Sequence, residues 1–308
     1  MAPIVLITAP AHPCLREGLE KAGYVVEQQL RPSSEWLIQH IERFTGIVVS
    51  THPTINSAVI DAATQLKWVA RLGSGMEHID SEYAAFKGIT CLSSPEGNCG
   101  AVGEHVLGML LNLLKCMQWS AEEVKEGKWI RDMQRGQELS GKTVGIIGYG
   151  HTGAAFARLL SPFDVVVLAH DKYKQGFANG YVREASLEQI QRYAQVVSLH
   201  LPLTAETYHY ADAAFFGALQ QQPYFLNSAR GALVNTPDLC AALEQQQICA
   251  AGLDVLENEQ PDSYTETENK YKQNLLQHKR VLITPHIAGY SQEAFRKMSE
   301  VILRKLGL

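Results

Sequence analysis

The feature that most constrains the fold of this chain is the alternation of short β-branched runs with longer amphipathic segments. The apolar runs lie at residues 4–8, 24–27, 46–50, 67–70 and 89–92, and helical patterns lie between them at 12–22, 34–43, 56–63 and 80–86. Successive parallel strands need a crossover connection, which a helix supplies. The first ninety or so residues therefore predict a parallel sheet with helices on its faces.

A second series of the same kind begins at residue 143. Its strand patterns lie at 143–147, 164–169, 195–200, 223–228, 249–255 and 281–284. An apolar-periodic helix at 100–126 joins the two series, the polar segment 258–274 has the least regular pattern, and a last helical pattern lies at 291–306. That last helix is expected to pack on the first series. We therefore expect an α/β fold of two doubly wound parallel-sheet domains, one formed by residues 1–97 and 288–308 and the other by 98–287.

Composition excludes several classes of partner. The formal net charge is −5 without clusters of Lys and Arg, which disfavours nucleic acid. No apolar run is long enough to span a bilayer and no secretory pattern is present, so we expect a soluble, cytoplasmic protein with no membrane partner. The six cysteines never form Cys-x-x-Cys and do not pair with histidines at metal spacing. We therefore expect no metal site and no disulfide.

A glycine pattern opens the second series. Gly148, Gly150 and Gly153 directly follow a predicted strand and begin a predicted helix. The spacing alone arises by chance in roughly one chain in ten of this length, so its position carries the argument. There the first glycine permits a tight turn, the second a close approach to a pyrophosphate, and the third close packing of helix on strand. The pattern predicts a dinucleotide site with its phosphates at the helix amino end.

The next predicted strand ends in Asp171, 18 residues after Gly153. A carboxylate at this place hydrogen-bonds the ribose hydroxyls of NAD and repels the additional phosphate of NADP. NAD is therefore the expected cofactor. Lys172 and Lys174 follow directly and leave NADP open as an alternative, and an aspartate that merely ends the strand is the other interpretation.

Three polar residues lie just past the ends of later strands, where open α/β sheets bind ligands. They are Arg230, Glu259 and His286. An arginine fork matches a carboxylate, a histidine can exchange a proton with a carbonyl oxygen, and a glutamate can hold the imidazole. Any one of them alone is more often structural, but together in a dinucleotide domain they predict a catalytic trio.

At these residues the chain resembles the D-isomer-specific 2-hydroxyacid dehydrogenase family. The resemblance runs from about residue 69 to about residue 294. It rests on the segments 71–80, 95–98, 104–105, 148–153, 200–204, 227–231, 252–255 and 284–289, and on Glu259. It implies a Rossmann NAD-binding domain inserted into a discontinuous flavodoxin-like substrate domain, and a homodimer formed through the helix near 104–118.

The resemblance also implies roles for individual residues. Gly73, Ser74 and Gly75 match a loop that holds the substrate carboxylate together with Arg230, and Asn98 matches a residue near the substrate. Glu259 and His286 match an acid/base pair. Cofactor contacts are implied for the glycine loop with Tyr149, His151 and Thr152, and for Asp171, His200, Pro202, Ala229, Arg230, Asp254, His286 and Gly289.

The sequence departs from the family pattern in three places. It reads Glu259-Gln260-Pro261 where relatives usually have Glu-Pro. The stretch 262–279 contains more residues than relatives usually have there, enough for an additional flap or helix. The segment 50–56 lacks the arginines that phosphoglycerate dehydrogenases often place there, which weakens the case for a phosphorylated substrate.

The resemblance implies hydride transfer between nicotinamide and C2 of a small 2-keto or D-2-hydroxy acid, of the glyoxylate or hydroxypyruvate type. One alternative is a phosphorylated hydroxyacid, 3-phosphoglycerate or 4-phosphoerythronate, since the segment 285–291 resembles the erythronate-4-phosphate branch. A different class of function is an NADH-sensing, corepressor-like binding protein, because some relatives of that kind keep the same trio.

Overall fold

The computed structural model describes residues 2–308, which form two compact units. Unit 1 comprises the residues up to Ala101 together with Gly289–Leu308, and unit 2 comprises Val102–Ala288. The sequence patterns set these boundaries at 97/98 and 287/288. The first boundary of the structure falls inside one helix, α5 (Pro95–Leu114), which therefore belongs to both units.

Unit 1 is built on a five-stranded parallel sheet in the order β2-β1-β3-β4-β5. This is the strand order of flavodoxin-like folds. Its strands are β1 (Ile4–Ile7), β2 (Val25–Gln28), β3 (Gly46–Val49), β4 (Trp68–Arg71) and β5 (Thr90–Ser93). Its helices, apart from the first part of α5, are α1 (Pro13–Lys21), α2 (Ser34–His40), α3 (Ser57–Ala62), α4 (Ser81–Phe86) and α12 (Gln292–Lys305).

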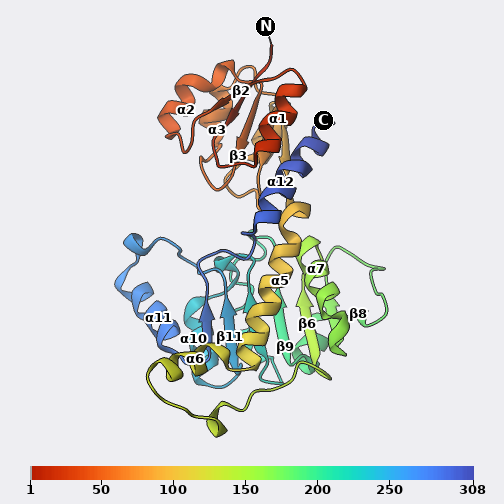
Figure 1. Ribbon diagram of the computed structural model, residues 1–308, viewed down its shortest axis with the longest axis vertical. Helices are drawn as coiled ribbons and strands as arrows, with labels where there is room; N and C mark the ends of the chain where they lie inside the picture. The colour runs from red at the N-terminus through yellow and green to blue at the C-terminus, as the bar shows by residue number, and fades with distance from the viewer. Residues whose placement is uncertain (1) are drawn as a thin grey trace. The chain divides into compact units, whose positions relative to one another are not determined.

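The last helix of the chain returns to unit 1, where α12 packs against α1 and β5 (Figure 1). The approach is close: a Cβ placed on Gly18 of α1 would lie 2.6 Å from Cδ1 of Leu303. Ile302 of the same helix is fully buried in a core cluster with Leu15 and Leu19 of α1. Unit 1 is therefore discontinuous in sequence because its core is incomplete without α12.

Unit 2 is built on a seven-stranded parallel sheet in the order β12-β11-β10-β9-β6-β7-β8. It contains the doubly wound order of dinucleotide-binding folds with one additional strand. Its strands are β6 (Thr143–Ile147), β7 (Val166–His170), β8 (Val182–Glu184), β9 (Val196–Leu199), β10 (Tyr224–Asn227), β11 (Ala250–Leu253) and β12 (Val281–Ile283). Its helices, besides the rest of α5, are α6 (Met117–Lys125), α7 (His151–Leu160), α8 (Leu187–Tyr193), α9 (Ala213–Gly217), α10 (Thr236–Glu244) and α11 (Glu266–Gln277). The expected fold class is confirmed.

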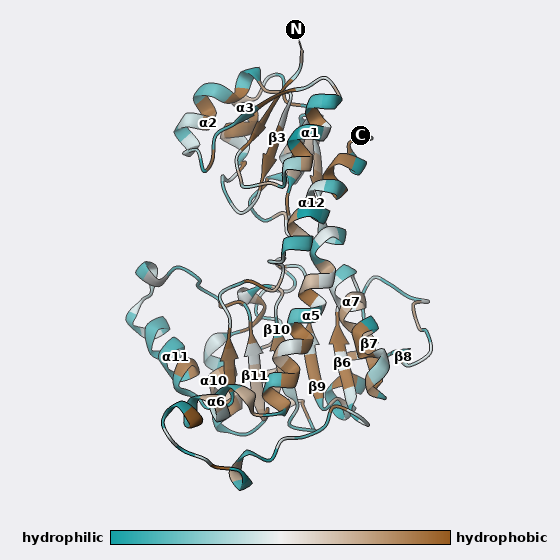
Figure 2. Cartoon of the chain, viewed as in Figure 1, coloured by the Kyte–Doolittle hydropathy of each residue, from teal (hydrophilic) through white to brown (hydrophobic). Residues whose placement is uncertain are grey.

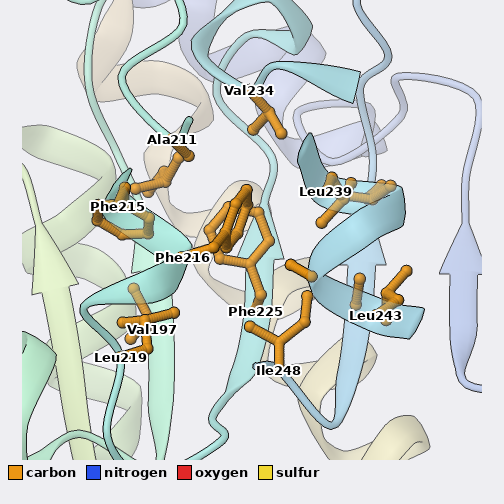
Figure 3. Close-up of a cluster of buried hydrophobic side chains, with 14 of the residues drawn as sticks. Val197, Ala211, Phe215, Phe216, Leu219, Phe225, Val234, Leu239, Leu243 and Ile248 are labelled. Carbon is orange, nitrogen blue, oxygen red and sulfur yellow. The ribbon is translucent and has the colours of Figure 1, made fainter. Parts of the chain in front are cut away.

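The core of unit 2 lies on both faces of this sheet. Figure 2 shows the strands β6, β7 and β9 as apolar, as expected for strands covered by helices on both sides. In Figure 3 the side chains of Phe216 and Phe225 lie at the centre of one cluster, with Leu239 and Leu243 of α10 beside them. Phe216 and Phe225 are completely buried. Side chains therefore cover both faces of the sheet, and the loops that follow the strands lie at its carboxyl edge.

Two elements differ from the sequence expectations. The predicted helix at 100–126 begins at Pro95 and breaks into α5 and α6, because Cys116 adopts a left-handed conformation with φ of 56°. The strand β8 was not predicted from the sequence. It is a three-residue edge strand, too short for a periodic signal.

The polar segment 258–274 is also more regular than its composition predicts. It contains most of α11, which a capping box begins: the Thr265 hydroxyl accepts from the Glu268 N–H, and the Glu268 side chain accepts from the Thr265 N–H. The sequence Thr-x-x-Glu carries this signal. Among residues 2–308, no helix is both long and apolar enough to cross a lipid bilayer.

The core of unit 2 gives a matched stability test. Leu239 of α10 is 2% exposed and Leu276 of α11 is 52% exposed, and both lie in helices. Leu239→Ala should lower the free energy of unfolding by about 2–5 kcal/mol, because it removes buried methyl groups and leaves a cavity. Leu276→Ala should lower it by less than about 1 kcal/mol. Urea unfolding followed by circular dichroism measures both, and equal losses would contradict the assigned core.

Candidate functional site

The glycine loop joins β6 to α7 and is shaped by close backbone contacts. Gly148 has φ of 93°, and a Cβ there would lie 2.4 Å from the His200 carbonyl oxygen. A Cβ on Gly153 would lie 2.1 Å from the Gly148 carbonyl oxygen. Gly150, in contrast, is the N-cap residue of α7, and a Cβ there would meet no atom of the described chain within 4 Å. The first and third glycines serve the turn itself, and the second keeps space open at the helix end.

The amino end of α7 can receive an anion. The N-cap residue of this helix is Gly150, which has no side chain to cap the first-turn N–H groups. Such groups, at the positive end of the helix dipole, bind phosphate oxygens. The open space at Gly150 lies at this helix end, so the pyrophosphate of a dinucleotide fits the residues present.

Asp171 follows β7 and is tied to the glycine loop. Its carboxylate accepts the backbone N–H of Tyr149 at 2.8 Å and those of Tyr173 and Lys174 at 3.0 Å each. Partial burial raises the pKa of this carboxyl, but the three N–H groups and the charge of Lys174 together hold the pKa below its ordinary value. A cavity of about 320 Å³ opens beside it, lined by His170, Asp171, Lys174, Phe177 and Glu184 among others. The loop after β7 therefore carries a charged carboxylate beside the glycine loop.

His200 follows β9 and contributes no positive charge. Its side chain lies within hydrogen-bonding distance of the Ser198 hydroxyl at 2.9 Å and of the Thr152 hydroxyl at 3.3 Å. Burial lowers the pKa of His200 to about 4, so the ring is neutral at physiological pH. The end of α7, rather than an imidazolium, is therefore the group that can attract an anion here.

Pro202 lies two residues after His200. Its carbonyl accepts from the Thr207 hydroxyl at 2.6 Å.

Arg230 lies in the loop that follows β10. Asn227 is the last residue of β10, and its side chain holds this loop. The Asn227 side chain accepts from the Ala229 N–H at 3.0 Å and donates to the Arg230 carbonyl at 2.8 Å. The next residue, Gly231, approaches the loop after β11 so closely that a Cβ would lie 1.8 Å from the Leu256 carbonyl oxygen. Only glycine fits at this contact, which holds the loops after β10 and β11 together. No role was predicted for Asn227, although it is a polar residue that ends an apolar strand.

Glu259 and His286 form the predicted pair. Nδ1 of His286 lies 2.8 Å from Oε2 of Glu259, and both side chains are less than half exposed at 44% and 42%. Because the carboxylate occupies Nδ1, Nε2 is the ring nitrogen that can face a ligand. The structure therefore joins two residues that are 27 positions apart in the sequence.

Asp254 holds the loop that carries His286. Its buried carboxylate accepts from the Thr284 hydroxyl at 2.5 Å and from the N–H groups of Ile287 and Ala288 at 2.9 and 2.8 Å. The Asp254 carbonyl accepts the N–H of His286, whose φ is 55°. These four bonds hold His286 in a left-handed backbone conformation that is rare for residues other than glycine.

His105 of α5 extends this network. Its Nε2 lies 2.9 Å from the Thr284 hydroxyl oxygen. Since that hydroxyl donates its proton to Asp254, it must accept from His105, which fixes the proton on Nε2. His105 and Thr284 belong to the motifs of the resemblance, but no site role was predicted for either residue.

His151 is the first residue of α7 in unit 2, whereas the predicted substrate loop and Asn98 belong to unit 1. Gly73, Ser74 and Gly75 follow β4, and Gly73 has φ of 143°. Ser94, which is fully buried, pins this loop: its hydroxyl accepts the Gly73 N–H at 2.9 Å, and its own N–H donates to the Gly73 carbonyl at 2.8 Å. Sequence reasoning missed Ser94. Asn98 lies near the start of α5, where a Cβ on Gly289 would be 3.0 Å from its Nδ2.

In unit 2 the predicted residues gather at the carboxyl edge of the sheet. Arg230, Glu259 and His286 follow β10, β11 and β12, which are neighbouring strands. The glycine loop, Asp171 and His200 follow β6, β7 and β9, which also are neighbours. The fold and these loops define an α/β dinucleotide-binding protein. Its histidine–carboxylate pair lies at the same carboxyl edge of the sheet as the glycine loop.

Comparison with known proteins identifies the family. Residues 107–288 match the model of the D-isomer specific 2-hydroxyacid dehydrogenase, NAD binding domain. The chain is 31% identical over 300 residues to D-3-phosphoglycerate dehydrogenase of Sus scrofa, covering 97% of this chain and 55% of that protein. It is 31% identical over 283 residues to glyoxylate reductase of Thermofilum pendens, covering 89% of this chain and 81% of the relative.

A solved structure has the same fold. D-lactate dehydrogenase from Aquifex aeolicus, complexed with NAD and lactic acid, superposes with a TM-score of 0.86 at 25% identity, over 99% of this chain and 94% of that one. The chain belongs to the D-isomer-specific 2-hydroxyacid dehydrogenase family, which confirms the resemblance, and NAD is the cofactor that its family domain binds. It spans about half the length of the phosphoglycerate dehydrogenase it matches.

The glycine loop yields a paired prediction. Gly150→Ala should keep the wild-type melting temperature, because a Cβ there meets open space, but should weaken NADH binding at least about tenfold by obstructing the pyrophosphate. Gly153→Ala should lower the free energy of unfolding by about 1–3 kcal/mol, because its Cβ overlaps a backbone carbonyl. Calorimetry and NADH fluorescence titration separate the two effects. Unchanged NADH affinity in Gly150→Ala would refute the placement of the phosphates.

Proposed function

We propose that this protein is an NAD-dependent oxidoreductase that interconverts a small 2-keto acid and its D-2-hydroxy acid, of the glyoxylate or hydroxypyruvate type. The observation that carries the proposal is the 2.8 Å contact between Glu259 and His286 at the sheet edge of an NAD-binding domain. The similarity to a protein named glyoxylate reductase supports the substrate class.

In this reaction each residue of the trio has one task. Bound NADH supplies the hydride that C2 of the keto acid accepts. Nε2 of His286 donates a proton to the carbonyl oxygen, and Glu259, held on Nδ1, stabilises the protonated ring before the transfer. The Arg230 guanidinium binds the substrate carboxylate as a fork. A substrate-binding role is also proposed for the loop of Gly73, Ser74 and Gly75, on the family resemblance alone. In the reverse direction the same imidazole accepts the hydroxyl proton.

The cofactor is proposed to lie along the carboxyl edge of the sheet in unit 2. The Gly148–Gly153 loop, with Tyr149, His151 and Thr152, would contact the pyrophosphate, and Asp171 the adenosine ribose. His200, Pro202 and Ala229 would line the site. Asp254 and Gly289 would lie toward the nicotinamide, as would Arg230 and His286.

A phosphorylated hydroxyacid is the second candidate substrate. The similarity to D-3-phosphoglycerate dehydrogenase favours it. Against it, the segment 50–56 contains neither lysine nor arginine for a phosphate group. A substrate panel that contains both kinds of acid therefore decides between them.

The first test is NADH oxidation with glyoxylate, hydroxypyruvate, pyruvate, 2-ketoisocaproate, phosphohydroxypyruvate and 2-oxo-3-hydroxy-4-phosphobutanoate, with NADPH in parallel. We expect rapid turnover of an unphosphorylated acid. His286→Ala should lower kcat by about 10²–10⁴-fold with NADH affinity kept, because only the proton donor is lost. His278→Ala, a histidine outside the trio, is the matched control and should keep its rate.

Two outcomes would contradict this proposal. Full activity in His286→Ala would remove the acid/base assignment. Tight NADH binding without turnover of any acid in the panel would favour the NADH-sensing binding protein over the enzyme.

We also propose that the protein is a cytoplasmic homodimer. Five large apolar side chains of α6 and the segment after it are exposed, with Trp129 at 82% and Met133 at 84%; the others are Met117, Val124 and Ile130. Exposed apolar groups concentrated in one segment indicate a contact surface. A second copy of the chain is the proposed occupant, because this segment directly follows the helix that the family resemblance associates with dimerisation.

The dimer can be tested by light scattering after size-exclusion chromatography. Trp129→Glu combined with Met133→Glu should shift the mass from about twice 34.1 kDa to that of one chain, because two charges would be buried in the interface. Tyr193→Glu, a substitution at an exposed aromatic residue elsewhere in unit 2, should leave the mass unchanged. A wild-type protein that elutes as a single chain would contradict the proposal.

A further inference from the structure

The loop after Asp171 contains the cations that a dinucleotide phosphate would need. Binding NADP in place of NAD requires positive charge for the additional phosphate on the adenosine ribose. Lys172 and Lys174 directly follow Asp171 and are the candidates. Both ammonium groups are engaged: Lys172 pairs with the carboxylate of Glu206, and Lys174 Nζ donates to the Tyr149 carbonyl at 3.2 Å.

Glu206 comes from a different strand end and is held on a structured turn. The Thr207 hydroxyl donates to the Pro202 carbonyl at 2.6 Å and accepts the Thr204 N–H at 2.8 Å, so the turn is closed on both sides of Glu206. Besides Lys172, the Glu206 carboxylate accepts the Tyr173 hydroxyl at 2.7 Å. Lys172 and Tyr173 therefore both contact the carboxylate of Glu206, and hydrogen bonds of the turn hold the backbone of Glu206.

The sheet order shows what this contact crosses. Lys172 follows β7 and Glu206 lies in the loop after β9, and these strands flank β6 on its two sides. The ion pair therefore joins the loops on either side of the glycine loop, which follows β6. In a doubly wound sheet the dinucleotide lies outside the carboxyl ends of these strands. The pair is thus at the adenosine end of the proposed cofactor site.

We propose that Glu206 makes this site selective for NAD over NADP by neutralising Lys172. The inference rests on the proposed dinucleotide site. With Lys172 paired, its charge no longer offsets the carboxylate of Asp171, which the additional phosphate of NADP would meet, with Glu184 in the lining of the adjacent cavity. Of the two lysines, Lys174 has no part in this ion pair, and its ammonium group donates to the Tyr149 carbonyl. The neutral ribose hydroxyls of NAD meet no such repulsion.

Removal of the charge on Glu206 should not affect folding. Lys172 and Glu206 are both more than 45% exposed, and ion pairs with such exposure contribute little to stability. The same two charges can affect the binding of a ligand, because a phosphate near the loop interacts with any charge that is left unpaired. Glu206→Gln keeps an oxygen for the Tyr173 hydroxyl and changes only the charge.

The experiment is equilibrium binding of NADH and NADPH, followed by fluorescence at low ionic strength. Glu206→Gln should tighten NADPH binding by roughly three- to tenfold and leave NADH within about twofold. Glu188→Gln removes one exposed carboxylate from the first turn of α8 and should change neither affinity. In Lys172→Gln with Glu206→Gln the gain should disappear, because the cation that Glu206 neutralises is gone.

An unchanged ratio of NADPH to NADH affinity in Glu206→Gln would overturn the proposal, and so would a gain that persists in the double variant. Binding is measured without a keto acid, so absence of turnover does not affect the test. If the wild-type protein binds neither dinucleotide, the proposed function itself fails.

Discussion

The buried carboxylate of Asp254 is the interaction on which the geometry of the candidate site depends. It directly follows β11 and binds the loop after β12 through one hydroxyl and two backbone N–H groups, while His105 reaches the same hydroxyl from α5. Without it, the Ala288 N–H would be buried and unsatisfied, at a cost of about 1–3 kcal/mol, and the Thr284 hydroxyl and the Ile287 N–H would lose their acceptor. The backbone of His286 would then lose the support for its left-handed conformation, and its ring would no longer be directed toward Glu259.

The two halves of the sheet edge hold their loops mainly by different means, although the Asp171 carboxylate also ties the glycine loop on the nucleotide side. On the nucleotide side the loops are shaped by backbone contacts that only glycine allows, at Gly148 and Gly153, and the attraction for an anion comes from the end of α7 because His200 is neutral. After β10, β11 and β12, where the trio lies, side chains hold the loops: the amide of Asn227 and the carboxylate of Asp254. Gly231 joins the loops after β10 and β11 by a backbone contact. This division fits a site with a fixed cofactor region and polar groups aimed at a reacting centre.

The sequence predicted most of the fold because parallel strands covered on both faces give short apolar runs, and the runs at 46–50 and 143–147 coincide with β3 and β6 to within a residue. It failed where the signal is local geometry. The break at Cys116 depends on a left-handed residue that has no glycine to mark it, and β8 is too short to show a period. The start of α11 was readable from Thr265 and Glu268, but the polarity of the segment concealed it.

By itself the sequence determined the two sheets, the glycine turn and the three polar residues past the strand ends, because each depends on residue type at fixed local spacing. Only the tertiary structure decided which of these residues meet. The contact of Glu259 with His286, the closing of the Asp254 network by His105, and the pairing of Lys172 with Glu206 all join segments that are far apart along the chain. Such contacts follow from the order of strands in the sheet, and no local pattern encodes that order.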